Sequence, residues 1–183
     1  KKGKAVVLLS GGLDSTVTLF DARARGYCVH AVVFDYGQRH RREKRCALAV
    51  AAQLDVPVYE VKISLPWGGS ALTDEGIAVP ENEPLDRTGI PVTYVPGRNS
   101  IFLSFAFSCA EAIGARRIFI GAHVQDYSGY PDCRPEFIRA FEEGINKGLA
   151  HPGIRIEAPL LKKTKKDIIR LGLKLGVDFA QTW

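Results

Sequence analysis

The residue types best suited to chemistry form a short loop, Ser10-Gly11-Gly12-Leu13-Asp14-Ser15. This loop separates two apolar runs, at 5–9 and 16–20, which predicts a strand, a tight turn and the start of a helix. Glycines let the backbone approach a ligand closely, and the first helical turn offers unpaired N–H groups at the positive end of the helix dipole. We therefore expect the loop to bind the phosphates of a nucleotide, helped by hydroxyl donors from Ser10, Ser15 and Thr16.

The loop differs from the two commonest phosphate-binding motifs, because the chain contains neither Gly-x-x-x-x-Gly-Lys-Ser/Thr nor Gly-x-Gly-x-x-Gly. The pattern Ser-Gly-Gly-x-Asp-Ser resembles instead the pyrophosphate loop of the N-type ATP pyrophosphatases. That resemblance implies binding of ATP and release of pyrophosphate while a substrate oxygen is activated as an adenylate. The same residue types also suit an ordinary strand-to-helix turn, with Asp14 or Ser15 as the N-cap of the helix.

Polar clusters also follow other predicted strands, and each lies at a carboxyl end. Phe-Asp-Tyr-Gly-Gln-Arg-His at 34–40 follows one strand, Gly121-Ala122-His123 follows another, and Lys162-Lys163-Thr164 follows the last. In doubly wound parallel sheets, ligands lie outside the carboxyl ends of the strands. The clusters are therefore expected to converge on one composite site.

An adenylating enzyme must bind a triphosphate with magnesium and stabilise the charge on the departing pyrophosphate. Asp14 is expected to position the loop or the metal, beside the hydroxyl of Ser15. Lys163 and Arg98 are expected to offset phosphate charge, and Phe34 to lie near the adenine. Arg98 opens a predicted helix, where anions are favoured; a plain surface charge is the alternative for this residue.

The segment 126–137 combines aromatic and charged side chains and ends at the start of a predicted helix. Aromatic rings stack on planar heterocycles, carboxylates accept hydrogen bonds from a guanine-like N–H edge, and a guanidinium pairs with a substrate carboxylate. The candidates for stacking are Tyr127, Tyr130 and Phe137. The candidates for accepting hydrogen bonds from the heterocycle are Asp132 and Glu136, and the candidate for pairing with the carboxylate is Arg134. The alternative is a turn in which the carboxylates of Asp132 and Glu136 cap and Phe137 is buried in the core. Cys133 has no adjacent His, so it is expected to be a pocket-lining thiol and not a nucleophile.

Alternating strand and helix patterns must position these residues. The continuous apolar strands are typical of a sheet covered on both faces, which predicts a three-layer, doubly wound parallel α/β fold with right-handed crossovers. Ile101, Phe105, Cys109 and Ile113 are expected to line one apolar face of a helix. Thr164 with Asp167 is expected to form a helix cap. The predicted strands are 4–9, 29–35, 57–63, 116–122 and 154–158, and the predicted helices are 15–25, 40–54, 98–113, 134–147 and 165–175.

Composition indicates one globular α/β domain over 1–183, with 46% hydrophobic residues. The prolines and glycines of 64–96 predict an irregular insertion that covers the site, or else a surface loop of no consequence. No apolar run approaches the roughly 20 residues needed to cross a membrane, and the four scattered cysteines are typical of reduced thiols, so a cytoplasmic location is expected. A net charge of +5 suits an anionic ligand or nucleic acid, but the basic clusters lack interleaved aromatic residues.

Five segments together resemble the 7-cyano-7-deazaguanine synthases: 10–15, 34–40, 95–104, 126–137 and 163–169. The resemblance covers nearly the whole chain, and 34–40 and 126–137 are its most specific parts. It implies conversion of 7-carboxy-7-deazaguanine to the nitrile with ATP, magnesium and ammonia, through adenylated acid and amide intermediates, on the route to queuosine. It also implies a homodimer with small-molecule substrates, without direct binding to nucleic acid or membrane.

The same resemblance implies roles for named residues. Those expected to bind ATP are Leu8, Leu9, Ser10, Gly11, Gly12, Leu13, Asp14, Ser15, Thr16, Val17, Thr18, Phe34 and Gly121. Those expected to bind the substrate are Tyr36, Gln38, Arg98, Asn99, Asp126, Tyr130, Asp132, Arg134, Glu136 and Phe137.

Members of this family carry a zinc-binding cysteine cluster just after a Thr-Trp pair, and here Thr182-Trp183 are the last residues. Zinc is therefore expected through cysteines beyond residue 183, and none of the four present is assigned as a metal ligand. Two other functions share the loop. A tRNA thiolase is disfavoured by the missing Cys-x-x-Cys pair, and a nonenzymatic adenine-nucleotide sensor leaves the segment 126–137 unexplained.

Overall fold

The computed structural model describes residues 2–37, 41–67, 70, 94–123 and 130–183. Its sheet has the strand order β3-β2-β1-β4-β5, and every strand pair is parallel, so the predicted doubly wound α/β fold is confirmed. The strands are β1 (Lys4–Leu8), β2 (Cys28–Asp35), β3 (Val58–Lys62), β4 (Arg117–Phe119) and β5 (Arg155–Glu157). The helices are α1 (Leu13–Ala24), α2 (Arg41–Gln53), α3 (Arg98–Ile113), α4 (Pro135–Asn146) and α5 (Lys165–Leu175), with short 3-10 helices η2 (Pro131–Cys133) and η3 (Phe179–Gln181).

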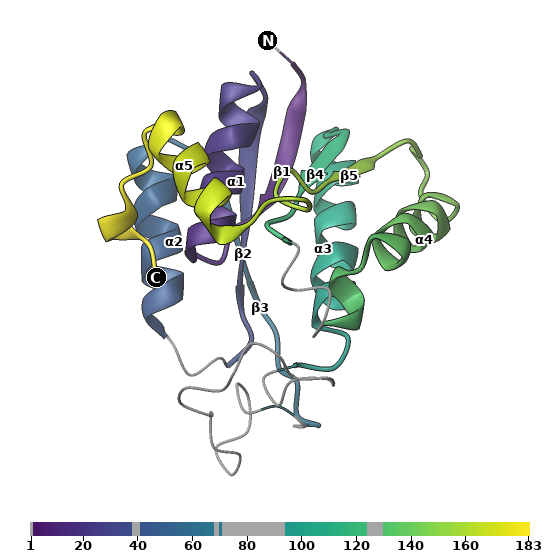
Figure 1. Cartoon of the computed structure of the whole chain (residues 1–183). Coiled ribbons are helices and arrows are strands. Elements are labelled where there is room, and N and C mark those ends of the chain that lie inside the picture. The colour runs from purple at the N-terminus through teal and green to yellow at the C-terminus, as the bar shows by residue number, and fades with distance from the viewer. Residues whose placement is uncertain (1, 38–40, 68–69, 71–93, 124–129) are drawn as a thin grey trace.

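Helices cover both faces of the sheet, with α1, α2 and α5 on one side and α3 and α4 on the other (Figure 1). Neighbouring residues of β1 pack into the cores on opposite faces of the sheet. Val7 packs with Leu19 and Val50 beneath α1 and α2, whereas Val6 packs with Phe107 beneath α3. Burial on both faces explains why the strands are continuous apolar runs in the sequence.

Two element boundaries differ from prediction in ways that affect the site. β4 ends at Phe119 and not at 122, so the chain leaves the sheet earlier than expected. α1 begins at Leu13 with Gly12 as its N-cap, so the prediction of a cap at Asp14 or Ser15 is wrong. The physical reason is that Gly12 takes the extended conformation of a cap, while the Ser15 hydroxyl donates back to the Gly12 carbonyl.

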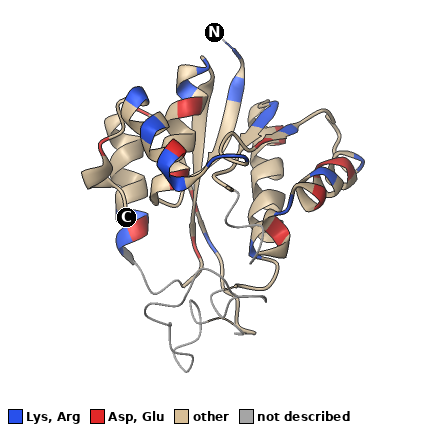
Figure 2. Ribbon diagram, in the orientation of Figure 1, with Lys and Arg blue, Asp and Glu red and all other residues tan. Residues whose placement is uncertain are grey.

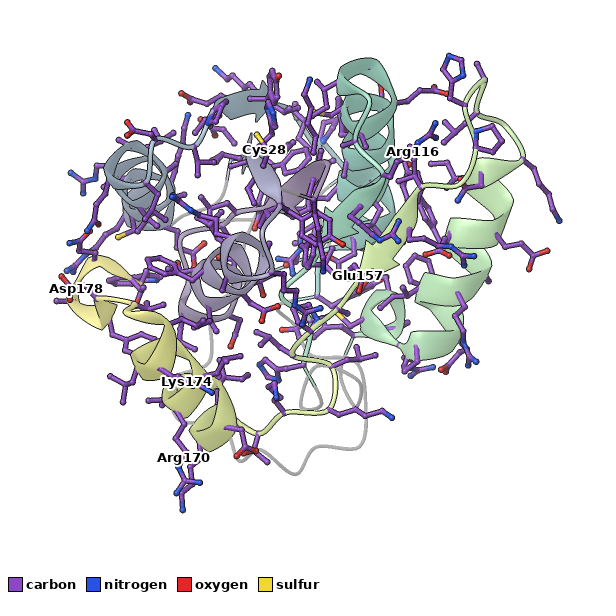
Figure 3. All side chains as sticks on the ribbon, turned by 90° about the horizontal axis from the view of Figure 1, so that it is seen from above. Cys28, Arg116, Glu157, Arg170, Lys174 and Asp178 are labelled. Carbon is purple, nitrogen blue, oxygen red and sulfur yellow. The ribbon has the colours of Figure 1, made fainter. Side chains whose placement is uncertain are left out.

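Helix α5 begins at Lys165, as predicted. The Thr164 hydroxyl accepts from the Asp167 N–H at 3.3 Å, and the Asp167 carboxylate accepts from the Thr164 N–H at 3.2 Å, which confirms the predicted capping box. In Figure 3, seen from above, α5 lies along α1, with Arg170 pointing away from the sheet. α5 also approaches α1 closely, because a Cβ on Gly172 would lie 2.9 Å from Val17.

The parts of the insertion at 64–96 that the structure describes, 64–67, 70 and 94–96, form neither helix nor strand, and the rest lies outside the described residues. All four cysteines are free, and only Cys133 is fully buried. None of the helices that the structure describes is long and apolar enough to cross a membrane. Lys and Arg residues are spread over several helices and are interspersed with acidic residues on α4 and α5 (Figure 2).

Candidate active site

A cavity of about 360 Å³ opens where β1, β2 and β4 end. β1 lies between β2 and β4, at the point where the strand order reverses, and doubly wound sheets bind ligands at such a switch point. The expected convergence of polar clusters is observed in part, because the clusters after β1, β2 and β4 contribute lining residues whereas Lys162, Lys163 and Thr164 do not. The binding roles stay predictions. The predicted residues that line the cavity are Leu8, Leu9, Ser10, Asp14, Ser15, Phe34, Tyr36, Arg98, Asn99, Gly121, Tyr130 and Asp132.

The phosphate loop, residues 10–15, curls around the hydroxyl of Ser15. This oxygen accepts hydrogen bonds from the N–H groups of Ser10 and Gly11, both at 3.2 Å, and donates to the Gly12 carbonyl at 3.0 Å. The Gly12 N–H donates to the Ser10 hydroxyl at 3.3 Å. The loop therefore gathers several N–H donors at the first turn of α1, which is the arrangement that binds phosphate.

Two glycines allow close approaches around this loop. Gly11 has φ +89°, and a Cβ there would lie 2.1 Å from the carbonyl oxygen of Glu43 and 2.6 Å from the nitrogen of Ala47, both in the backbone of α2. A Cβ on Gly121, just after β4, would lie 3.0 Å from the nitrogen of Ser15. The loop is therefore packed against α2, and the chain after β4 against the start of α1, without room for side chains.

Asp14 lies in a small group of charged and titratable side chains. Lys165 Nζ lies 2.9 and 2.6 Å from the two carboxylate oxygens of Asp14, and His123 Nε2 lies 3.5 Å from one of them. His123 is buried, with 5% of its surface exposed. The carboxylate at the first turn of α1 is thus held by residues from α5 and from the segment after β4. Neither Lys163, the predicted cation, nor Lys165 lines the cavity, but Lys165 is the lysine that contacts Asp14.

Arg98 projects from the start of α3 and donates to the Tyr36 hydroxyl at 3.4 Å. Burial opposes the charge of its guanidinium, but the neighbouring Tyr36, Tyr130 and Asp132 outweigh this effect and raise the pKa of Arg98. Arg98 is therefore a permanent cation that lines the cavity.

Asp132 joins η2 to the start of α3. Its carboxylate accepts from the backbone N–H of Asn99 at 2.9 Å and from the Asn99 side-chain amide at 3.3 Å, and that amide also donates to Cys133 Sγ at 3.1 Å. Asp132 thus caps α3 from a distant part of the chain. It also lines the cavity, as does Cys133, which agrees with a pocket-lining thiol.

Arg134, Glu136 and Phe137, also predicted from the segment 126–137, do not line the cavity. Arg134 and Glu136 are exposed at the start of α4. The Phe137 ring is half-buried against the core and packs on Phe141 with 5.6 Å between ring centroids, so the burial that the alternative interpretation predicted is partial. Asp126 and Tyr127 lie outside the described residues.

The remaining residues predicted to bind ATP belong to the loop or to the buried side of α1. Val17 and Thr18 have no exposed surface, and Val17 packs against Ile168 of α5. Gln38 lies outside the described residues. The predicted ATP-binding residues that do not line the cavity are Gly11, Gly12, Leu13, Thr16, Val17 and Thr18.

Sequence reasoning missed several residues of the site. Phe102 stacks on Phe34, with ring centroids 3.9 Å apart and ring planes at 6° to each other. The two stacked rings line the cavity together. Lys165 was not singled out, although it lies in the segment 163–169 that carries the resemblance. Ala122, named only as part of the cluster at 121–123, lines the cavity. The missed residues that line the cavity are Glu43, Phe102, Leu103 and Ile120.

Of the two metals that the resemblance implies, the described residues fit magnesium but not zinc. Among these residues, no three His, Cys, Asp or Glu side chains lie close enough together to hold a metal ion. Magnesium commonly binds through one or two carboxylates and phosphate oxygens, and the Asp14 carboxylate fits that pattern. A structural zinc ion takes four Cys or His ligands, and the described part of the chain does not bring such a set together.

The fold is that of the adenine nucleotide α-hydrolase-like proteins. NMN synthetase from Francisella tularensis superimposes with a TM-score of 0.60 at 18% identity, over 97% of this chain and 63% of that protein. NH3-dependent NAD synthetase from Campylobacter jejuni superimposes with a TM-score of 0.55 at 17% identity, over 97% of this chain and 66% of that one. At these identities the likeness shows a shared fold.

The chain belongs to the family of queuosine biosynthesis protein QueC, whose family model matches residues 4–183. A 7-cyano-7-deazaguanine synthase from Ectopseudomonas mendocina (strain ymp) is 54% identical over 185 residues, which cover 98% of this chain and 81% of the relative. A 7-cyano-7-deazaguanine synthase from Nostoc punctiforme is 51% identical over 188 residues, which cover 98% of this chain and 84% of the relative. The family resemblance and the expectation of an enzyme are therefore confirmed.

Proposed function

We propose that this chain is a 7-cyano-7-deazaguanine synthase that converts 7-carboxy-7-deazaguanine and ammonia to the nitrile at the expense of ATP, in queuosine biosynthesis. The observation that carries the proposal is one cavity shared by the phosphate loop and by Arg98, Tyr130 and Asp132. A nucleotide and a planar acid must meet in one place for one to activate the other. Relatives named as this synthase, at 51 to 54% identity, support the choice of substrate.

In this proposal the phosphates of ATP lie at the phosphate loop, where its N–H groups donate to phosphate oxygens in place of the Ser15 hydroxyl. Lys165 is close enough to Asp14 to move between that carboxylate and a phosphate. Its charge then stabilises the departing pyrophosphate. Magnesium, when bound, neutralises the triphosphate, and Asp14 is the residue that would hold it.

The acid substrate lies in the part of the cavity formed by α3 and η2. Tyr36, Tyr130 and the Phe34–Phe102 pair supply aromatic surface for a planar ring. Arg98 lines the cavity whereas Arg134 is exposed, so Arg98 is the better placed cation for the carboxylate or for phosphate.

Two activations of the same kind lead from the acid to the nitrile. A carboxylate oxygen attacks the α-phosphorus of ATP and pyrophosphate leaves; ammonia then attacks the acyl adenylate, AMP leaves and an amide with one released proton results. The amide oxygen attacks the α-phosphorus of a second ATP and pyrophosphate leaves. Loss of AMP and of the two nitrogen-bound protons gives the nitrile. One site can serve both rounds, because each round places an oxygen of the same substituent against the α-phosphorus of an ATP bound in the same position.

The test uses full-length protein with 7-carboxy-7-deazaguanine, magnesium, ATP and ammonium, and follows nucleobases and nucleotides by mass spectrometry. Substrate-dependent formation of AMP and nitrile is the expected result. Nitrile with a different nucleotide product would keep the function and overturn the adenylate route. Binding of ATP without turnover would favour a different acceptor, as in a thiolase, or a nucleotide sensor.

Substrate orientation is tested with the variants Asp132→Ala and Arg134→Ala. We expect Asp132→Ala to lose most activity, because the carboxylate is both buried in the site and bonded to Asn99. Wild-type rates in both variants would remove the hypothesis that this segment orients the heterocycle. A homodimer, a cytoplasmic location, zinc bound by further cysteines, the absence of nucleic-acid binding and a single domain over 1–183 remain proposals from the resemblance and from composition.

A further inference from the structure

Trp183 contacts the phosphate loop directly. Its backbone N–H donates to the carbonyl oxygen of Gly11 at 3.0 Å. Its carbonyl oxygen lies 3.8 Å from the place that a Cβ on Gly12 would occupy. Figure 1 shows the end of the chain marked C beside α2, which agrees with these contacts. Gly11 is therefore hydrogen-bonded to a residue about 170 positions later in the chain, and Gly12 lies next to that residue.

A side chain of α2 holds the Trp183 ring. The guanidinium carbon of Arg42 lies 4.8 Å from the ring centroid, within the range of a cation–π interaction. The next residue of α2, Glu43, has its carbonyl oxygen against Gly11. α2 thus packs against the loop with its backbone and holds Trp183 with Arg42. Arg42 belongs to the basic cluster at 39–45 and is the residue of that cluster whose guanidinium lies over the Trp183 ring.

The contact fixes the orientation of one peptide group in the loop. A trans peptide is planar, and its C=O and N–H point in opposite directions. Holding the Gly11 carbonyl toward Trp183 therefore directs the Gly12 N–H to the other side. On that side the Gly12 N–H donates to the hydroxyl of Ser10, a residue that lines the cavity.

We propose that Trp183, held by Arg42, is a positioning residue that orients the Gly11–Gly12 peptide for phosphate binding. This inference rests on the nucleotide binding of the proposed function, and it adds a residue outside the cavity to the machinery of the reaction. Trp183 acts through the loop and does not touch the nucleotide. Its loss is therefore expected to weaken ATP binding while leaving the affinity for the acid unchanged.

The experiment compares full-length Trp183→Ala, Arg42→Ala and Arg42→Lys with the wild type. Binding of a nonhydrolysable ATP analogue is measured by calorimetry, and KM values for both substrates by turnover. Arg45→Ala is the matched control, because Arg45 is an exposed cation on the same helix. We expect a rise of about twofold to fivefold in the Kd of the analogue for Arg42→Ala, which corresponds to an exposed cation–π contact.

Trp183→Ala is expected to raise the Kd by at least as much, and Arg42→Lys to restore part of the loss because lysine keeps the charge above the ring. A double variant no worse than Trp183→Ala would show that both residues act through one contact. A lower melting temperature with unchanged Kd for the analogue would make the contact purely structural and overturn the inference. If the wild type binds the analogue but makes no nitrile, the proposed function fails, whereas the Kd comparison still decides the inference.

Discussion

Replacing Gly11 with alanine tests the packing of the phosphate loop against α2. The new Cβ would lie 2.1 Å from the Glu43 carbonyl oxygen, a fixed backbone atom, at a position with φ +89°. The left-handed conformation costs an alanine about 1–2 kcal/mol, and forcing a methyl group into a packed site costs about 1–3 kcal/mol. The free energy of unfolding is therefore expected to fall by about 2–5 kcal/mol if the loop keeps its place.

Thermal unfolding and ATP-analogue binding together show how the protein accommodates this methyl group. In a protein of this size, a loss of 2–5 kcal/mol lowers the melting temperature by roughly 4–20 °C. If the loop moves instead, a displacement of about 1 Å lowers kcat/KM by roughly 100-fold. Gly144→Ala in α4 is the control, because a Cβ there would meet nothing within 4 Å. A Gly11→Ala variant with both the melting temperature and the ATP kinetics of the wild type would refute the packing argument.

Three further predictions follow from the charges and the close contacts. Lys165→Met is expected to lower kcat about 100-fold or more, because Lys165 contacts Asp14 in the proposed site. Lys163→Met is expected to lower kcat much less, and equal losses would contradict the assignment of Lys165 as the lysine that stabilises the pyrophosphate. Gly121→Ala is expected to raise the KM for ATP, because its Cβ would lie 3.0 Å from the nitrogen of Ser15 in the first turn of α1, and an unchanged KM would show that the chain after β4 can shift. The hydrogen bond from Lys44 lowers the pKa of Asp35, so the stability it adds is present above about pH 4 and is lost as pH falls through the lower folded pKa. Thermal melts of Asp35→Asn are expected to show a deficit at pH 7 that disappears near pH 2, and a deficit independent of pH would exclude this cause.

The architecture was largely predictable, because parallel strands covered on both faces leave a clear pattern of apolar runs. The position of the site also followed from the sequence, since the carboxyl ends of neighbouring parallel strands meet at one edge of the sheet. Individual contacts were less predictable. Asp14 meets Lys165 and not Lys163, because that choice depends on where α5 begins and on how it packs against α1.

The buried face of α3 was predicted only in part. Cys109 and Ile113 pack against the core as expected, but Phe105 is 41% exposed. The buried residues of α3 are Leu103, Ala106, Phe107 and Ala110. The helix is apolar on most of its circumference, so periodicity alone cannot select the face that meets the sheet. The capping of α3 by Asp132 was also invisible, because it joins residues 33 positions apart.

The link between α1 and α5 has a consequence for synthesis of the protein. The ion pair of Asp14 with Lys165 joins residues 151 positions apart, and the bond from Trp183 to Gly11 spans still more of the chain. Contacts between distant parts of a chain form late, since most of the polypeptide must first be ordered. During translation the loop at 10–15 emerges from the ribosome long before Lys165 and Trp183. In the proposed function, ATP affinity therefore awaits the docking of α5 against α1.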